Sequence, residues 1–311
     1  MTAAIGTEPV IRVRGLTKRY GDVRAVDGID FDVGAGQIFG LLGPNGAGKT
    51  TTVEILEGLR EADGGEVSVL GIDVSRDPDA LKPRIGVSLQ TAAMYPKLTV
   101  AELIDLFKSF YAKTRPTDEL IDAFELGERR NAQSQVLSGG QRQRLGVALS
   151  LVNDPELIFL DEPTTGLDPA ARRSLWDLVR GFKDQGKTVL LTTHYMEEAE
   201  ILCDRLAIMD HGRILEMGTV EELVTRHFQE RAVRFDRVDG LGHDELAALP
   251  AVTAAKDDTH ETLVYTNDVA ATIGALLPLA DGRGIELRNL GIRRATLEDV
   301  FLELTGRALR D

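Results

Sequence analysis

An apolar stretch that runs directly into a glycine-rich loop constrains this 311-residue chain more than any other feature. Gln37 to Gly43 has the composition of a strand buried on both faces, and Lys49 to Leu59 carries apolar residues at helical spacing. The segment that joins them reads Gly43-Pro44-Asn45-Gly46-Ala47-Gly48-Lys49-Thr50. A buried strand, a glycine-rich loop and a helix in this order predict an α/β fold with a phosphate-binding loop.

The loop has the residue types that a nucleoside triphosphate requires. Gly43, Gly46 and Gly48 allow backbone N–H groups to approach anionic oxygens, because a Cβ atom would block that approach. The helix that begins near Gly48 adds the partial positive charge of its N-terminus. Lys49 can reach the β and γ phosphates, and the Thr50 hydroxyl can ligate Mg²⁺. We therefore predict a triphosphate site with Mg²⁺ at this loop.

Two acids and a histidine follow apolar strands later in the chain. Asp161 and Glu162 end the strand Leu157 to Leu160, and His194 follows Thr188 to Thr193. The ends of such strands face the ligand crevice, so Asp161 is placed to hold Mg²⁺ and Glu162 to orient or deprotonate the attacking water. His194 is placed to hydrogen-bond the transferring group. Taken singly, the acids could be a solvated loop and the histidine a core residue.

Two further candidates carry weaker signals. Gln90 ends the strand Arg84 to Leu89, and a neutral side chain that both donates and accepts suits Mg²⁺ and water. Tyr20 follows Lys18-Arg19 in the first hairpin region, where its ring could stack on adenine. By themselves, a solvated glutamine and a half-buried surface tyrosine are the simpler interpretations.

A second helix N-terminus suited to phosphate lies at Ser138-Gly139-Gly140-Gln141. Ser138 is a natural N-cap, the two glycines leave N–H groups exposed, and the helix is expected to run to about Val152. One triphosphate does not need two such termini on one lobe. We infer that this terminus contacts the γ-phosphate held by a second copy of the chain.

The chain is expected to form two domains. Residues 8–229 alternate strands and helices, which predicts an α/β domain with a parallel sheet. Within it, residues 94–152 are expected to form an inserted helical subdomain, and Thr99-Val100-Ala101-Glu102 is a capping box for a helix to about Ala112. Residues 230–311 are expected to form a small α+β accessory or regulatory domain that ends in a helix, Thr296 to Leu304.

The expected order in the second domain is strand, helix, strand, strand, helix, strand, as in a split β-α-β unit. The strands are expected at Ala232–Arg237, Val252–Lys256, Thr262–Thr266 and Ile285–Leu290, and the helices at Asp244–Ala248 and Val269–Leu279.

Composition excludes several classes of function. A formal net charge of −14 lacks the basic footprint of a protein that binds nucleic acid or an anionic membrane surface. No apolar stretch approaches the roughly 18–20 residues needed to span a bilayer, and Met1 to Val13 lacks the pattern of a signal peptide, so a membrane role is expected to come through a partner. A single cysteine, Cys203, suits a reducing cytoplasm.

Together these motifs resemble the nucleotide-binding domain of ABC transporters, over residues 10–225. Gly43–Thr50 is similar to the Walker A motif, Leu157–Glu162 to Walker B, and Leu137–Gln141 to the family signature. The remaining single positions of the resemblance are Tyr20 for adenine stacking, Gln90 for the Q-loop, Asp168 for the D-loop and His194 for the switch histidine.

The resemblance assigns roles to three groups of residues. The ATP-binding residues are Tyr20, Gly43, Pro44, Asn45, Gly46, Ala47, Gly48, Lys49, Thr50 and Thr51. The contacts expected from the second copy are Ser138, Gly139, Gly140, Gln141 and Asp168. The expected catalytic residues are Glu162, His194 and Gln90, and the expected Mg²⁺ ligands are Thr50, Gln90 and Asp161.

The resemblance also implies a mode of action. In the family, two such domains sandwich two ATP molecules head to tail, and hydrolysis opens the dimer and drives membrane subunits. The implied partners are a second copy and an integral membrane permease, at the cytoplasmic face of the cell membrane. The segment Thr296 to Gly306 resembles the tail of exporters of the daunorubicin-resistance type, which implies export of drugs or antibiotics. Export of polysaccharide, lipid or haem, and a soluble ABC ATPase outside transport, are the alternatives.

Overall fold

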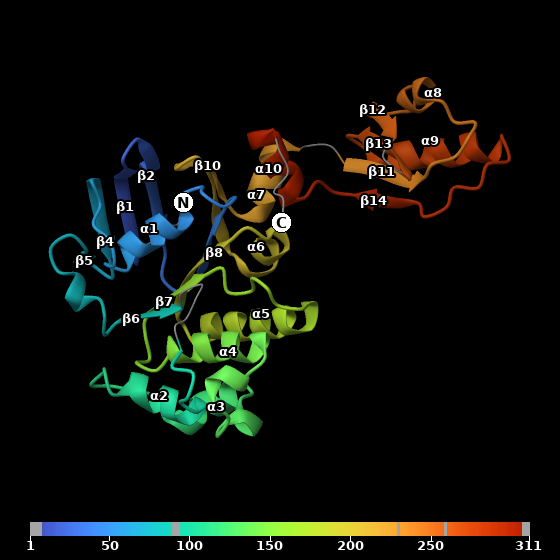
Figure 1. Cartoon of the computed structure of the whole chain (residues 1–311). Coiled ribbons are helices and arrows are strands. Elements are labelled where there is room, and N and C mark those ends of the chain that lie inside the picture. Colours follow the sequence, from blue (N-terminus) through green and yellow to red (C-terminus); the bar gives the residue numbers. More distant parts are fainter. Residues whose placement is uncertain (1–7, 89–93, 229–230, 258–259, 307–311) are drawn as a thin grey trace, which may run out of the picture. The chain divides into compact units, whose positions relative to one another are not determined.

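The computed structural model describes residues 8–88, 94–228, 231–257 and 260–306. They fall into two compact units, the first reaching Val220 and the second running from Glu221 to Ala308 (Figure 1). None of the helices in the described ranges is long and apolar enough to cross a membrane.

A six-stranded sheet, in the order β10-β9-β3-β8-β7-β6, is the centre of the first unit. Its strands are β3 (Ile38–Leu42), β6 (Ile85–Ser88), β7 (Leu157–Asp161), β8 (Thr188–Thr193), β9 (Arg205–Asp210) and β10 (Arg213–Gly218). All neighbours pair in parallel except β9 and β10, which form a hairpin. Every residue of β3, β7 and β8 is buried, as expected for strands with both faces covered. The predicted α/β fold is therefore confirmed.

An antiparallel sheet covers one face of the central sheet together with α1 (Lys49–Leu56). Its order is β2-β1-β4-β5, with β1 (Ile11–Tyr20), β2 (Val23–Val33), β4 (Gly64–Val69) and β5 (Ile72–Asp73). Phe31 of β2 stacks on Phe39 of β3, with ring centroids 5.6 Å apart. Such stacking adds to the apolar burial that holds the two sheets together.

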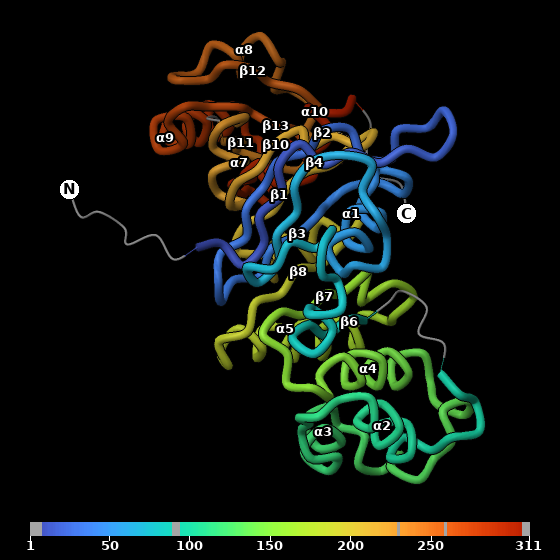
Figure 2. The backbone as a smooth tube through the Cα atoms, turned by 90° about the vertical axis from the view of Figure 1, so that its left-hand side faces the viewer, coloured from blue at the N-terminus to red at the C-terminus, as the bar shows by residue number. Residues whose placement is uncertain are grey.

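Helices pack on the opposite face of the central sheet. They are α2 (Val100–Lys108), α3 (Thr117–Ala123), α4 (Gly139–Leu149), α5 (Pro169–Asp184) and α6 (Met196–Leu202). Both views place α2 and α3 beside α4, on the side away from β1 and β2 (Figures 1 and 2). The capping box at Thr99 and Glu102 is present, although α2 ends at Lys108 and not near Ala112. Single 3₁₀ turns lie at η1 (Pro78–Ala80), η2 (Gly127–Arg129) and η3 (Ser134–Val136).

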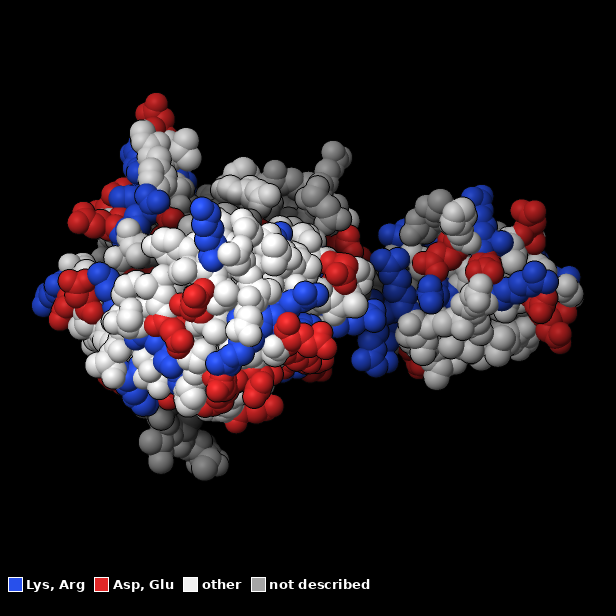
Figure 3. All heavy atoms as spheres, turned by 60° about the horizontal axis from the view of Figure 1, so that its bottom comes forward, with Lys and Arg blue, Asp and Glu red and all other residues white. Residues whose placement is uncertain are grey.

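The surface of the larger unit mixes charges of both signs. Figure 3 shows acidic and basic side chains interspersed over the visible face of that unit. Ion pairs at the surface of this unit include Arg144 with Glu125 and Arg84 with Glu156. Exposed pairs of this kind contribute little to stability individually.

The second unit contains a four-stranded antiparallel sheet in the order β12-β13-β11-β14. Its elements follow one another as β11 (Arg231–Asp236), α8 (His243–Ala247), β12 (Val252–Asp257), β13 (Glu261–Thr266), α9 (Val269–Asp281) and β14 (Gly291–Arg293). This is the predicted order of the split β-α-β unit. Helices α8 and α9 pack on one face of the sheet, where Leu246 and Leu276 meet Val233, Phe235 and Val264.

The prediction of a strand at Ile285–Leu290 is wrong. The fourth strand is β14, which pairs with β11 only from Gly291 onward. Asn289 takes a left-handed φ of +54°, and its side chain amide donates to the carboxylate of Asp236 at 3.0 Å. The Asp236 N–H of β11 still donates to the carbonyl of Arg288 at 2.9 Å, but the turn at Asn289 interrupts the pairing, and asparagine tolerates such a φ better than most residues.

Two helices complete the second unit, α7 (Val220–His227) and α10 (Leu297–Thr305). The Asp299 carboxylate accepts a hydrogen bond from the Thr296 backbone at 2.8 Å, which fixes the start of α10. Nδ1 of His227 on α7 lies 3.6 Å from Oε2 of Glu303 on α10, so the two helices are in contact. The second compact unit begins at Glu221, within α7.

Candidate functional site

The loop between β3 and α1 can be formed only by glycine at two positions. Gly48 precedes α1 with a φ of +100°, and a Cβ atom there would lie 2.2 Å from the carbonyl oxygen of Ala25. A Cβ on Gly43 would lie 2.2 Å from the carbonyl oxygen of Met209. Both distances are shorter than any van der Waals contact, so β2 and β9 determine how closely the loop folds. Asn45 and Gly46, at the tip of the loop, are exposed to solvent.

Lys49 points back into this loop from the first residue of α1. Its ammonium donates to the carbonyl oxygens of Gly43 at 2.8 Å and Pro44 at 3.2 Å, and it lies 3.5 Å from Oε1 of Glu162. Burial lowers the pKa of Lys49, and the neighbouring Glu162 carboxylate opposes that shift. A buried cation beside exposed loop N–H groups is suited to a polyanion.

Thr50 and Asp161 place a hydroxyl and a carboxylate close together, so that both could coordinate one metal ion. The Thr50 hydroxyl lies 3.3 Å from Oδ2 of Asp161, and Thr192 of β8 donates to the other carboxylate oxygen. Burial raises the pKa of Asp161, and this hydrogen bond opposes the shift. One carboxylate and one hydroxyl beside a phosphate-binding loop match the way Mg²⁺ is bound beside phosphates. The residues present therefore fit this ion.

Glu162 is held in a strained backbone conformation at the end of β7. Its φ is +46°, and its backbone N–H donates to both the hydroxyl (3.1 Å) and the carbonyl (3.2 Å) of Thr192. A positive φ in a residue other than glycine is costly and tends to occur at functional sites. This backbone conformation directs the Glu162 side chain toward Lys49 and His194.

The Glu162 carboxylate lies between a cation and an imidazole. Oε1 is 3.5 Å from the Lys49 ammonium and 3.3 Å from Nδ1 of His194, and Thr165 donates to Oε2 at 3.2 Å. The carboxylate is 7% exposed, so little water competes for it. The structure thus assembles Lys49, Thr50, Asp161, Glu162 and His194, all predicted site residues, at the carboxyl edge of the central sheet.

The other predicted site residues either lie apart from this cluster or fall outside the residues that the structure describes. Ser138 forms a capping box with Gln141: the Gln141 N–H donates to the Ser138 hydroxyl at 3.2 Å, and Gln141 accepts from the Ser138 N–H at 3.0 Å. Asp168 caps α5 and accepts from the N–H groups of residues 170 and 171. In the described part of the chain, no hydrogen bond or ion pair joins Ser138 or Asp168 to Lys49. Gln90 lies outside the described residues.

Tyr20 is exposed at the end of β1. Its ring is 41% exposed, with the Arg60 guanidinium 5.2 Å and the Lys18 ammonium 5.9 Å from the ring centroid. Pro44, Ala47 and Thr51 belong to the loop and the first turn of α1, where Ala47 is 1% exposed.

Sequence reasoning missed a stack of side chains behind His194. The Tyr195 ring centroid lies 4.1 Å from that of His194, and the Arg172 guanidinium carbon lies 4.6 Å from the Tyr195 ring. Arg172 lies on α5, one helical turn after Asp168, so the stack connects the start of that helix to His194. The only sequence signals were an aromatic residue adjacent to His194 and an arginine at i+4 from Asp168.

We expect Tyr195→Ala to lower the kcat of ATP hydrolysis roughly 10- to 100-fold and to leave KM for ATP unchanged, because the His194 ring loses the surface that orients it. Tyr195→Phe keeps the ring and should retain activity close to the wild type. Steady-state phosphate release at several ATP concentrations gives both constants. A raised KM with an unaltered kcat would show that Tyr195 supports binding and not the positioning of His194.

A buried carboxyl lies just beyond the C-terminal end of α1. Glu57 is 3% exposed, and its Oε2 has no hydrogen-bond partner among the described residues. Burial raises the pKa of Glu57 to about 8, and the carboxylates of Asp161 and Glu54 add to this shift. The folded chain therefore binds a proton that the unfolded chain releases above about pH 4.5.

We expect Glu57→Gln to flatten the dependence of stability on pH. The stability contributed by the protonated Glu57 carboxyl is fully present below about pH 4.5 and is lost as the pH rises to about 8. The difference in unfolding free energy between the variant and the wild type should therefore grow by about 2–4 kcal/mol from pH 5 to pH 8. Urea unfolding at both pH values measures it, with the exposed Glu61→Gln as control. A constant difference would contradict the burial of a titrating carboxyl here.

Comparisons with known proteins agree with the geometry of the site. A family model described as ABC transporter matches residues 26–165. The chain is 40% identical to the Nod factor export ATP-binding protein I of Ralstonia nicotianae, over 99% of this chain and 97% of that protein. It is also 40% identical to the daunorubicin/doxorubicin resistance ATP-binding protein DrrA of Streptomyces peucetius, over 99% of this chain and 96% of that protein.

A solved structure shows the same fold with products bound. It is a dimeric ATP-binding cassette in a post-hydrolysis state with ADP and phosphate, 27% identical to this chain, with a TM-score of 0.62. The match covers 67% of this chain and 98% of the cassette. The chain belongs to the ABC transporter family, as an ATP-binding subunit that hydrolyses ATP.

Proposed function

We propose that this chain energises the export of drugs, antibiotics or other hydrophobic molecules through a separate membrane subunit, by ATP-driven head-to-tail dimerisation. The observation that carries the catalytic part of this proposal is the cluster of Lys49, Asp161, Glu162 and His194 at one sheet edge. The relatives named for Nod factor export and for drug resistance carry the export part.

Each residue of the cluster has a different role in hydrolysis. When ATP binds, the Lys49 ammonium replaces its hydrogen bonds to the two loop carbonyls with hydrogen bonds to phosphate oxygens. A full positive charge then lies against the β and γ phosphates. Glu162 accepts a proton from the attacking water, and His194 holds the Glu162 carboxylate and the transferring phosphate in line. Thr50, Asp161 and Gln90 would hold Mg²⁺, which when bound neutralises the charge that develops on the phosphate oxygens.

A second copy of the chain supplies the remaining contacts. Ser138 and Gly139 are exposed at the start of α4, an eleven-residue helix whose N-terminal N–H groups attract anions. We propose that Ser138, Gly139, Gly140, Gln141 and Asp168 contact the ATP that is held by Lys49 of the other copy. Within the described part of one copy, no hydrogen bond or ion pair joins Ser138 to the Lys49 cluster, which supports a role between copies.

The membrane subunit places the chain and selects the molecule to be exported. We propose that the chain docks on an integral membrane permease at the cytoplasmic face of the cell membrane, and that nucleic acid is not a ligand. Relatives named for drug resistance and for Nod factor export have the same identity to this chain, at 40%. Identity to these relatives therefore does not separate the two substrate classes, and export of a lipid or polysaccharide is the second candidate function.

Reconstitution tests the proposal. The chain would be co-purified with its permease and placed in lipid vesicles, and ATPase activity would be measured with daunorubicin and with a lipid-linked oligosaccharide. We expect one of the two classes to stimulate hydrolysis, against a background set by the Lys49→Ala complex. A chain that fails to bind any permease yet hydrolyses ATP at full rate would contradict the role in export.

A further inference from the structure

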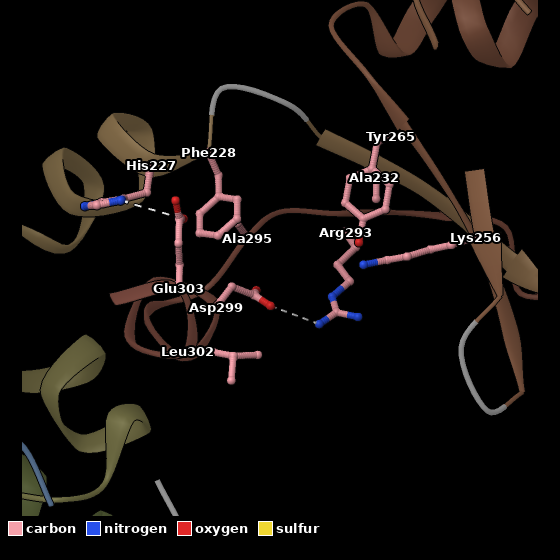
Figure 4. Close-up of a pocket in the computed structure, with 10 residues that line it drawn as sticks. All are labelled: His227, Phe228, Ala232, Lys256, Tyr265, Arg293, Ala295, Asp299, Leu302 and Glu303. Carbon is pink, nitrogen blue, oxygen red and sulfur yellow. Dashed lines mark hydrogen bonds and ion pairs between the residues drawn. The ribbon is translucent and has the colours of Figure 1, made fainter. Parts of the chain in front are cut away.

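The second unit contains a cavity of about 410 Å³ that no predicted ATP-site residue lines (Figure 4). The β-sheet bounds it on one side, and the end of α7 and one side of α10 bound it on the other. A cavity of this size accommodates a small organic molecule.

A small residue at the centre of a row of side chains creates the floor of this cavity. Tyr265 of β13 pairs with Ala232 of β11, which in turn pairs with Arg293 of β14. Neighbouring residues of a strand point to opposite faces, and Val233 and Val264 enter the core beneath α8 and α9. The row of Tyr265, Ala232 and Arg293 therefore lies on the other face, where the methyl group of Ala232 leaves a hollow between two long side chains.

Aromatic and aliphatic groups form the walls. Phe228, at the end of α7, and Tyr265 lie on opposite sides of the cavity, and Leu302 of α10 and Ala295 line it as well (Figure 4). Aromatic rings on two sides of the cavity favour a planar apolar body, since such a body can contact both.

Among the described residues, one of the cations that line the cavity has no acidic partner. Arg293 lies 3.5 Å from Asp299, and His227 lies 3.6 Å from Glu303, so each of the two α10 acids that line the cavity has a partner. The ammonium of Lys256 lies 4.8 Å from the centroid of the Tyr265 ring and forms no ion pair within the described ranges. Lys256 is also the only lysine in residues 221–308. An anionic group on a ligand would pair with it.

We propose that this cavity binds a small amphipathic anion. Its planar apolar body lies between Phe228 and Tyr265, and its carboxylate or sulfonate pairs with the Lys256 ammonium. The ligand contacts α7, α10 and the sheet at once and therefore stabilises the second unit as a whole. This site goes beyond the proposed function, because neither ATP nor its hydrolysis enters the argument.

The first test uses the full chain and the fluorescent probe 8-anilinonaphthalene-1-sulfonate, an aromatic sulfonate. We expect saturable binding of one probe per chain. Leu302→Trp fills the cavity with a larger side chain and should abolish that binding. The control is Leu277→Trp on α9, because Leu277 and Leu302 are similarly exposed, at 47% and 46%. The absence of saturable binding, or equal binding by the two variants, would overturn the proposal.

The second test isolates the charge. N-phenyl-1-naphthylamine has the same aromatic body as the first probe and lacks the sulfonate. Lys256→Ala should weaken the sulfonate probe about threefold to fivefold and change the affinity of the neutral probe less than about twofold. The exposed Arg288→Ala serves as control, since it removes a cation from the same unit. Equal weakening of both probes by Lys256→Ala would contradict pairing of the anion with Lys256.

Discussion

Glu162→Gln is expected to reduce ATP turnover about 10²- to 10⁴-fold and to leave the subunit as an ATP-bound dimer. Glutamine keeps the size of the side chain and its contacts with Lys49 and Thr165, but it cannot take a proton from water. The substitution also removes a negative charge that lies 3.5 Å from the Lys49 ammonium. Less negative charge beside the γ-phosphate favours the ATP-bound state, because like charges repel in a site that excludes water.

Phosphate release and light scattering in the presence of ATP measure the two effects of Glu162→Gln. The matched control is Glu197→Gln, an exposed glutamate in the first turn of α6, which should retain full turnover. Wild-type turnover by Glu162→Gln would show that another group takes the proton. Loss of turnover in both variants would point to a disturbance of α6 and His194 and not to the chemistry of Glu162.

Lys49→Ala is expected to weaken the binding of a non-hydrolysable ATP analogue about 10- to 100-fold. The ammonium supplies charge-assisted hydrogen bonds to phosphate, each worth about 1.5–3 kcal/mol. Removing it leaves the loop glycines and the helix N-terminus to hold the triphosphate. Calorimetric titration with the analogue measures the affinity directly.

Lys113→Ala is the control for Lys49→Ala, because Lys113 is an exposed cation that pairs with Asp154 and is not among the predicted ATP contacts. It should change the affinity for the analogue less than about threefold, as expected for one exposed charge. Thermal unfolding of both variants checks that the fold is kept. Unchanged affinity in a folded Lys49→Ala would contradict the role of this lysine in binding phosphate.

The features that the sequence predicted well depend on local signals. The fully apolar runs of β3, β7 and β8 mark buried parallel strands without any knowledge of their neighbours. The capping boxes at Thr99 and Ser138 involve residues three positions apart, so a short window contains the whole interaction. Position 48 requires glycine because its φ of +100° is unfavourable for residues with a Cβ atom.

The features that the sequence missed depend on contacts between distant segments. The left-handed conformation of Glu162 is held by Thr192, 30 positions away, and nothing near Glu162 indicates it. The stack of Arg172 on Tyr195 forms only because α5 and the end of β8 lie side by side. At residues 285–290 the alternation of apolar and polar residues favours a strand, and the turn at Asn289 overrides that local preference.

The central claim is that each ATP site is shared between two copies, and mixing two inactive variants tests it most directly. Lys49→Ala disables the loop side of a site, and Ser138→Arg blocks the exposed α4 terminus that serves the other copy. A mixed dimer then has one site with both defects and one site with none. Equal mixing makes about half of the dimers mixed, so the account predicts recovery of about one quarter of wild-type ATPase activity. Mixtures that stay as inactive as the separate variants would contradict a shared site.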